Sequence, residues 1–194
     1  MLTVACVEWG NYQGRGRDYV ARLQAMAARH LTVPHEFRCI RPDAVTGDLD
    51  GWWNKVLLFR PGLFKGRVLY LDLDTIVVGT LDELVRHKGL LHLDEWGWKE
   101  KVYGSGVMVW DAGEHEEIYS RFTPAVAARL RGDQDWMTEL GGWGALPPGI
   151  CCSYKYHCAK RGRPAAGASV VCFHGPIKPH TLPEGHWVRE YWRA

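Results

Sequence analysis

The segment from residue 67 to 84, RVLYLDLDTIVVGTLDEL, constrains the fold more than any other part of the chain. Two apolar runs rich in β-branched residues, Val68–Leu71 and Ile76–Val78, flank the acidic residues Asp72 and Asp74. Such runs are typical of buried strands in a parallel or mixed sheet. Ionised carboxylates beside a core are costly unless they are paired or bind a metal. Both aspartates point to the same side of an extended chain, so we expect a hard-cation site at a strand end.

Patterns typical of strands alternate with patterns typical of helices over the rest of the chain. This alternation predicts an α/β fold, organised as one Rossmann-like domain over residues 1–194 with a central, mostly parallel sheet flanked by helices. In such folds ligands bind at the carboxyl ends of the strands. The expected strands are residues 3–9, 35–40, 68–71, 76–78, 103–111 and 168–174. The expected helices are residues 18–29, 52–59, 80–85, 114–122, 124–130 and 134–140.

The overall charge is close to balanced, with 24 Lys and Arg residues against 22 Asp and Glu residues and a net charge of +2. This total gives no reason to expect a nucleic acid or an anionic membrane as a partner. No apolar run approaches the ~20 residues of a membrane span, and the N-terminus MLTVACVEWG lacks a basic leader, so a cytoplasmic protein is expected. The six cysteines contain no C-x-x-C pair, and we expect most of them to be buried thiols.

Phosphatases of the haloacid dehalogenase type also place two aspartates at the end of a strand. Their motif is D-x-D-x-T, with a threonine four positions after the first aspartate. Here Thr75 directly follows the second aspartate, and Ile76 takes the fourth position. The apolar run also continues without the glycine turn expected of those enzymes. The local spacing therefore excludes this phosphatase class.

The run WWNKVLLFRPGLFKGRVLYLDLDTIVVGTLDEL combines a lysine-bearing helix, a strand, D-x-D-T, a short apolar strand and a D-E-L helix, in that order. It resembles the retaining glycosyltransferases of family 8, the group that contains glycogenin and bacterial galactosyltransferases. Four further segments match this family in order, namely GSGVMVWDAGE, GDQDWM, LPPGICCSYKY and VVCFHGPIKPH. The resemblance covers the chain from about Trp52 onward, and more weakly from Thr3.

This resemblance implies a glycosyltransferase A-type fold and the transfer of a hexose from a nucleotide sugar, expected to be a UDP-sugar, with retention at the anomeric carbon. Mn²⁺ or Mg²⁺ would be held by Asp72 and Asp74 and would bridge the donor diphosphate. The third metal ligand of the family is a histidine, and the aligned residue here is Cys172. Because imidazole suits Mn²⁺ better than a thiolate does, we expect His174 as the third ligand. Cys172 is the alternative, and a metal with two protein ligands plus water also stays open.

The resemblance also implies roles for individual side chains. Asp133 and Gln134 would face the donor sugar, with the Gln134 amide oxygen near the anomeric carbon. Lys178 would contact a diphosphate oxygen. Tyr12 would stack on uracil, and Glu8 would hydrogen-bond to its edge. The residues expected to bind the donor are Glu8, Asn11, Tyr12, Lys55, Asp72, Leu73, Asp74, Ser105, Gly106, Asp133, Gln134, Gly175 and Lys178, and those expected to take part in catalysis are Asp133, Gln134 and Lys178.

The acceptor is not predicted by the sequence. A glycan, a lipid-linked sugar, a protein, a small molecule and a modified nucleobase all stay open, as does the oligomeric state. Two other functions also stay open. One is a nucleotide-sugar-binding protein that has lost transfer, which the cysteine at position 172 suggests. The other is a metal-dependent phosphohydrolase that uses the same carboxylates.

Overall fold

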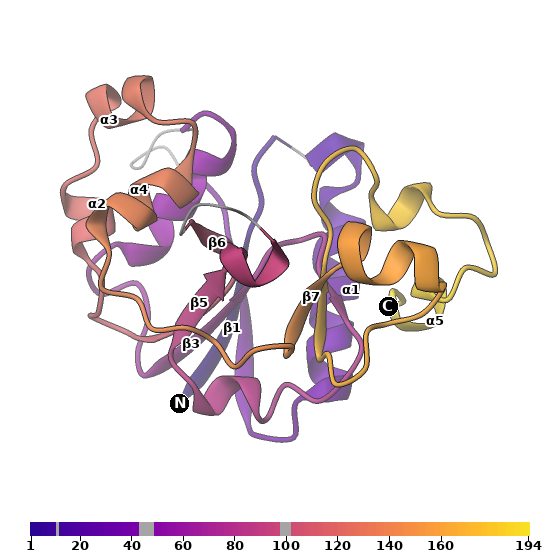
Figure 1. Ribbon diagram of the computed structural model, residues 1–194. Coiled ribbons are helices and arrows are strands. Elements are labelled where there is room, and N and C mark those ends of the chain that lie inside the picture. Colours follow the sequence, from indigo (N-terminus) through magenta and orange to yellow (C-terminus); the bar gives the residue numbers. More distant parts are fainter. Residues whose placement is uncertain (11, 43–48, 98–101) are drawn as a thin grey trace.

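The computed structural model describes residues 1–10, 12–42, 49–97 and 102–194. A five-stranded sheet at its centre has the strand order β2-β1-β3-β6-β5 (Figure 1). Strands β2, β1 and β3 are parallel, and β6 is antiparallel to both of its neighbours. The sheet is therefore mostly parallel, as predicted. Its strands are β1 (Leu2–Val7), β2 (His35–Ile40), β3 (Arg67–Leu71), β6 (Tyr103–Asp111) and β5 (Gly89–His92).

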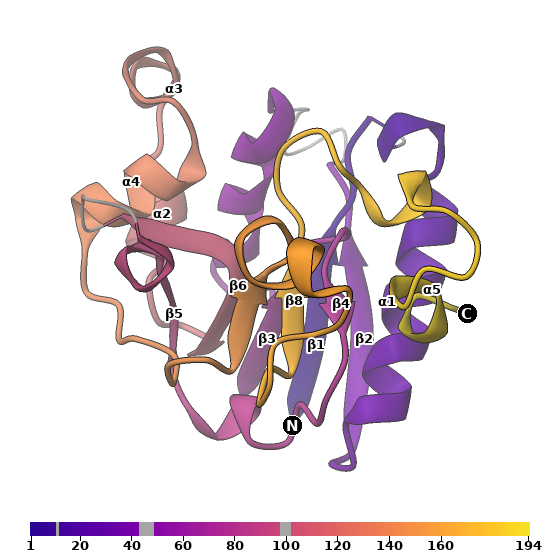
Figure 2. The ribbon, with the colours of Figure 1, turned by 45° about the vertical axis from the view of Figure 1, so that its right-hand side comes forward.

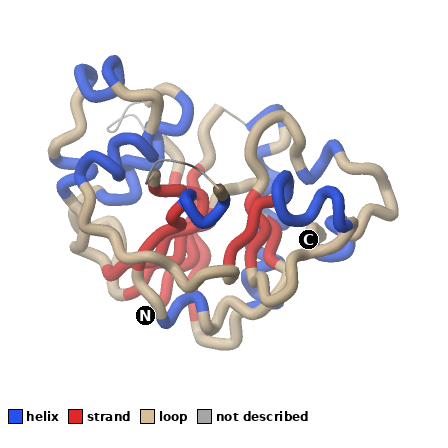
Figure 3. The backbone as a smooth tube through the Cα atoms, viewed as in Figure 1, coloured by secondary structure: helices blue, strands red, loops and turns tan. Residues whose placement is uncertain are grey.

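A second sheet of three short strands has the order β4-β8-β7, and Figure 3 shows it beside the larger one. Its strands are β4 (Ile76–Val77), β8 (Val170–Cys172) and β7 (Cys151–Ser153). Strand β8 pairs antiparallel with β4 and parallel with β7. Because β4 begins five residues after β3 ends, the turn at 72–75 connects the two sheets.

The alternation of side chains along β1 separates two hydrophobic clusters. Val4 and Cys6 pack in one cluster with the buried face of α1, whereas Ala5 and Val7 pack in the other with residues of η2, α2 and α4.

The helices cover both faces of the large sheet. Figure 2 shows α1 and α5 on one side of this sheet and α2, α3 and α4 on the other. The α-helices are α1 (Gly16–His30), α2 (Glu117–Ser120), α3 (Pro124–Arg129), α4 (Asp133–Leu140) and α5 (Val188–Tyr191). The other helical segments are η1 (Tyr12–Gly14), η2 (Gly51–Phe59), η3 (Leu84–Arg86), η4 (Leu93–Trp96), η5 (Tyr154–Cys158), η6 (Ala159–Arg161) and η7 (Pro179–Thr181).

Most of the predicted elements are present, but several have different bounds. The helix predicted at 80–85 is wrong, because the chain forms only the single turn η3 after a bend in which the Leu81 N–H donates to the His30 carbonyl. The strand predicted at 168–174 is limited to β8, so its last two residues lie beyond the sheet. Strands β5 and β7 were not predicted, since each is too short to show a periodic pattern.

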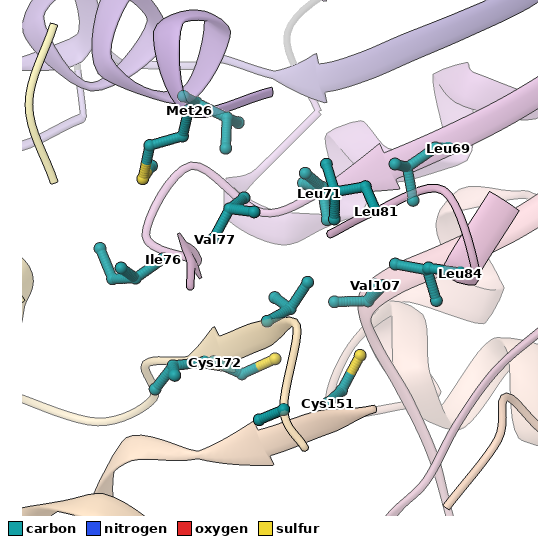
Figure 4. Packing of buried hydrophobic residues seen from close by; sticks show 14 of the residues in the cluster. Met26, Leu69, Leu71, Ile76, Val77, Leu81, Leu84, Val107, Cys151 and Cys172 are labelled. Carbon is teal, nitrogen blue, oxygen red and sulfur yellow. The ribbon is translucent and has the colours of Figure 1, made fainter. Parts of the chain in front are cut away.

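The core between α1 and the small sheet is apolar and includes five buried cysteines. Figure 4 shows Cys172 of β8 and Cys151 of β7 pointing into the same cluster as Leu71, Ile76 and Val107. Both thiols are buried, as expected from the sequence. Within the described part of the chain, no helix combines the length and the apolar character needed to cross a membrane.

Candidate active site

The two aspartates of the D-x-D motif lie on a turn rather than on an extended strand. Strand β3 ends at Leu71, and both the N–H and the hydroxyl of Thr75 donate to the Asp72 carbonyl, at 3.0 and 2.8 Å. The expectation that the two aspartates lie on an extended strand is therefore wrong, but their side chains still lie at the same pocket. Asp72 and Asp74 both line a pocket of about 510 Å³, and Leu73 between them lines it too.

Lys55, from the buried face of η2, links three polar groups beneath this pocket. Its Nζ lies 2.8 Å from Asp72 Oδ1 and 3.7 Å from Asp133 Oδ2, and it donates to Ser105 Oγ at 3.0 Å. Lys55 is only 5% exposed. Burial lowers the pKa of its ammonium group, but Asp133 and Asp72 outweigh this, so that the pKa is raised overall. Tyr70 adds a hydroxyl that donates to Asp72 Oδ1 at 2.6 Å.

Asp133 and Gln134, which were expected to face the donor sugar, begin α4 and line the pocket. The Asp133 side chain is 4% exposed, and its Oδ2 has no hydrogen-bond partner among the described residues. Burial raises the pKa of Asp133, although the Lys55 ammonium acts in the opposite direction. An acceptor oxygen that is buried at a pocket wall and lacks a hydrogen bond is costly, so this atom is suited to receive a ligand hydroxyl.

Lys178 lies on the loop that follows β8, and its Nζ donates to Asp74 Oδ2 at 2.6 Å. Burial and the neighbouring Asp72 raise the pKa of Asp74, and Lys178 partly offsets them. Gly175, earlier on the same loop, has a φ of 76°, which favours glycine, and it lines the pocket together with Lys178. Each aspartate of the motif is thus neutralised by one lysine from a distant part of the chain.

Tyr12 lines the pocket close to Asp74, and burial together with this carboxylate raises the pKa of the phenol. Its ring packs on Tyr19 at a centroid distance of 4.9 Å. The predicted donor residue Asn11 lies outside the described residues. Glu8, which was also expected to bind the donor, does not line the pocket. Its carboxylate accepts from Arg41 Nε at 2.7 Å.

Ser105 and Gly106 lie behind the pocket wall rather than on it. Ser105 is fully buried and accepts from Lys55, while the Gly106 carbonyl accepts from the Asp72 N–H at 2.9 Å. A Cβ on Gly106 would lie 3.3 Å from Asp72 Oδ2, so the glycine keeps the wall close to the carboxylate. These two residues support the aspartate, whereas the sequence predicted that they contact the donor.

The structure does not bring His174 together with the two aspartates. Within the described ranges, no three or more His, Cys, Asp or Glu side chains form a group that could hold a metal. The Nε2 of His174 is instead 2.7 Å from Ser153 Oγ, and its ring stacks on Trp96. Burial, aided by Lys155 and Lys178, lowers the pKa of this histidine. The alternative ligand, Cys172, is 6% exposed and points into the core, where burial raises the pKa of its thiol.

The chemistry of the remaining donor set fits a hard divalent cation. Asp72 and Asp74 offer carboxylate oxygens at the pocket surface. Mg²⁺ is commonly bound by one or two carboxylates together with substrate phosphates and water, without further protein ligands. The arrangement therefore agrees best with the expectation of two protein ligands, and His174 is not required.

Several pocket residues were not predicted from the sequence. The walls also contain Val7, Trp9, Trp52, Val102, Arg131, Gly132, Asp135 and Phe173. Trp52 is 53% exposed, and its indole Nε1 donates to the Arg131 carbonyl at 3.1 Å. Trp52 lies three positions before Lys55, and this spacing could have identified it as a pocket residue.

No model of a protein family matches the chain, and no curated protein matches it. Solved structures do match. The galactosyltransferase LgtC, in complex with donor and acceptor sugar analogues, is 13% identical with a TM-score of 0.62, over 98% of this chain and 93% of that one. The glycosyltransferase GlyE of Streptococcus pneumoniae TIGR4 is 16% identical with a TM-score of 0.66, over 98% of this chain and 59% of that one. A glycosyltransferase involved in glycosylation of the major capsid of PBCV-1 is 14% identical with a TM-score of 0.59, over 88% and 92%.

The chain has a glycosyltransferase A-type fold. At these sequence identities, the similarity to solved structures establishes the fold alone. The pocket lies where β1 and β3 end. Its residues come from the carboxyl ends of these two parallel strands, from η2, from the start of α4 and from the loop after β8. This is the edge of the sheet at which the sequence predicted a ligand.

Proposed function

We propose that this chain is a metal-dependent glycosyltransferase that moves a hexose from a nucleotide sugar, of which a UDP-sugar is the expected form, with retention at the anomeric carbon. The observation that carries the proposal is one pocket in a GT-A fold with two carboxylates, each paired with a lysine. A structural ion pair needs no pocket, whereas here Asp72, Asp74, Lys55 and Lys178 all line one.

The carboxylates and lysines suit a diphosphate. When a nucleoside diphosphate leaves the sugar, negative charge develops on the leaving oxygen. Lys178 places a positive charge at the pocket wall, and Gly175 allows the backbone to approach a phosphate closely. Mn²⁺ or Mg²⁺ bound by Asp72 and Asp74 would act as a Lewis acid toward the same charge.

The start of α4 suits the hexose. The Oδ2 of Asp133, which lacks a hydrogen bond, can accept one from a sugar hydroxyl, and the Lys55 ammonium favours the ionised form of this buried carboxylate. Gln134 lies beside it on the pocket wall. No carboxylate is assigned as a nucleophile, so retention follows from attack on the face from which the diphosphate leaves, with a phosphate oxygen taking the proton of the acceptor hydroxyl.

The test is release of UDP from a panel of UDP-hexoses in the presence of Mn²⁺, first without an acceptor. We expect slow release by the unmodified chain, and loss of release in excess EDTA or on Asp72→Asn or Asp74→Asn substitution. Asp82→Asn, at a partly exposed aspartate that accepts a hydrogen bond from Thr32 and does not line the pocket, is the matched control and should retain the activity.

Full UDP release by either variant in EDTA would overturn the metal-dependent mechanism. Binding of the nucleotide sugar without release under any condition would leave a binding protein that has lost transfer. Release of UMP and hexose 1-phosphate in place of UDP would assign the carboxylates to hydrolysis of the diphosphate.

A further inference from the structure

The near-neutral total charge conceals an uneven distribution along the chain. Residues 140–183 contain no Asp or Glu, but they contain five basic residues, Lys155, Lys160, Arg161, Arg163 and Lys178. Since the whole chain has 24 basic and 22 acidic residues, the remainder of the chain is net acidic. An uneven distribution of this kind indicates a surface that meets a negatively charged partner.

Four of these cations are concentrated in η5, η6 and the residues directly after them. Lys155, Lys160, Arg161 and Arg163 are all exposed. Among the side chains that the structure describes, no carboxylate forms an ion pair with any of these four cations. The fifth cation, Lys178, is paired with Asp74. The first four therefore form a basic patch that no described carboxylate neutralises.

Aromatic rings lie next to the basic patch. Tyr156 is 49% exposed, and Lys155 Nζ lies 5.3 Å from its ring centroid. The ring centroid of His174 is 5.3 Å from that of Tyr156, and His174 also stacks on Trp96, at a centroid distance of 6.2 Å and an interplanar angle of 22°. A row of Tyr156, His174 and Trp96 thus runs from the basic patch across the loop after β8.

This row reaches the donor pocket. Phe173 and Gly175, the two neighbours of His174 in the chain, both line the pocket, whereas His174 does not. Figure 2 shows the segment with η5 and η6, in orange, in front of β8 and beside the loop that follows this strand. A ligand that lies on the ring row and the basic patch would therefore have one end at the pocket.

We infer that the basic patch and the ring row bind a single-stranded segment of nucleic acid and present one of its bases to the pocket as the acceptor. Cations along a surface contact phosphates, and aromatic faces beside them stack on bases, which is the usual combination in proteins that bind single strands. Identification of the acceptor rests on the proposed transferase function, whereas the binding does not. The hexose would pass from the diphosphate oxygen to a base-borne hydroxyl, whose proton goes to the leaving diphosphate.

The composition of the patch favours a nucleic acid over a membrane surface. Proteins that lie on membranes present Trp, Phe or Leu beside their cations and insert them below the headgroups. Residues 155–163, KYHCAKRGR, contain none of these, and their exposed ring is the phenol of Tyr156. Trp96 of the ring row stacks on His174, and the flat Tyr and His rings offer faces on which bases can stack.

The test is the binding of fluorescein-labelled dT20 to the full chain, followed by fluorescence anisotropy between 50 and 200 mM salt. Four phosphate contacts predict a slope of log affinity against log salt of about −2.8. Lys160→Gln with Arg161→Gln should make this slope shallower by about 1.4 and weaken binding about 20-fold near 0.1 M salt. Tyr156→Ala should weaken binding about tenfold without changing the slope.

Arg60→Gln with Lys65→Gln is the matched control, because these exposed basic residues lie on the loop before β3, at the opposite end of that strand from the pocket. Absence of dT20 binding at 50 mM salt, or equal weakening by the control pair, would overturn the inference. Binding to anionic phosphatidylglycerol vesicles but not to dT20 would assign the patch to a membrane instead.

Release of UDP separates this inference from the proposed function. The patch variants should release UDP from the donor at the unmodified rate, since none of the substituted residues lines the pocket. If the unmodified chain bound dT20 but released no UDP from any donor, the transferase would be wrong and the nucleic-acid surface would stand. Loss of UDP release in the patch variants would instead show that the patch belongs to the donor site.

Discussion

At the scale of single residues, Lys55 controls the charge balance of the pocket. Its ammonium is shared between Asp72 and Asp133, and both lysine and Asp133 are almost fully buried. Breaking a buried ion pair from one side is costly because an uncompensated charge remains. The lysine therefore serves the stability of the fold as well as the site.

Lys55→Met should lower the free energy of unfolding by about 3 kcal/mol at neutral pH. Burial already raises the pKa of Asp133, and loss of the lysine should raise it further. A carboxyl with a raised folded-state pKa stabilises the fold only while it is protonated, so stability falls as pH rises above about 4 toward that pKa. The variant should therefore be more stable relative to the unmodified chain at pH 5 than at pH 8, as measured by urea unfolding. An equal loss of stability at both pH values would contradict this account.

The position of Cys172 gives a second test at this scale. Its side chain points into the core, so Cys172→His buries a larger, polar group without space for it. We expect a loss of about 2 kcal/mol in the free energy of unfolding and no gain in Mn²⁺ affinity. Cys172→Val is the matched control and should be close to neutral. Tighter Mn²⁺ binding by the histidine variant would show that position 172 reaches the metal after all.

At the scale of elements, the start of α4 depends on a contact with η2. A Cβ on Gly132 would overlap the indole of Trp52, whose Cδ1 lies 2.8 Å from that position. Gly132 has an extended φ of 175°, which any residue can adopt. Glycine is required here because there is no space for a side chain. Because Asp133 and Gln134 follow directly, the indole fixes where they enter the pocket.

Gly132→Ala should displace Trp52 from the Arg131 carbonyl and lower kcat/KM for UDP release about tenfold, since small shifts of positioned groups are costly. The double variant with Trp52→Ala relieves the overlap. It should therefore perform no worse than Trp52→Ala alone. Additive losses in the double variant would exclude the proposed coupling.

The same scale shows how much of the site was predictable. Asp72 and Asp74 of the D-x-D motif and the helix start at Asp133–Gln134 were identified from ordered local motifs, and all four residues line the pocket, although the turn that carries the two aspartates was not predicted. Glu8 lies outside the pocket wall because its partner, Arg41, is brought beside it by the parallel pairing of β1 and β2, in which Val7 is opposite Ile40. No local sequence pattern predicts such a pairing. The strand predicted at 168–174 ends at Cys172, so His174 lies beyond the sheet and apart from the two aspartates.

At the scale of the whole molecule, the two ends of β3 have different tasks. The carboxyl end leads to the pocket, whereas Arg67 at the amino end joins β3 to β6 and to the chain before β5. Its guanidinium lies 2.6 Å from Asp111 and donates to the carbonyls of Val85 and His87. The contacts that stabilise the sheet and the residues of the pocket thus lie at opposite ends of β3.

Arg67→Met should therefore lower stability without affecting the site. Loss of these bonds, at a partly exposed position, is expected to cost about 1–2 kcal/mol, which corresponds to a fall of roughly 2–8 °C in Tm for a chain of this size. The KM for the donor should not change. A lower Tm by calorimetry combined with an unchanged KM supports the division, and a rise in KM with unchanged Tm would refute it.

The central claim is that Asp72 and Asp74 bind a divalent metal that holds a nucleoside diphosphate. The most direct measurement is calorimetric titration of UDP into the unmodified chain and into Asp74→Asn, each with Mn²⁺ and with EDTA. The account predicts that UDP binds to the unmodified chain in Mn²⁺, and that EDTA or the substitution weakens this binding at least tenfold, about 1.4 kcal/mol. Equal affinity for UDP in all four titrations would contradict it.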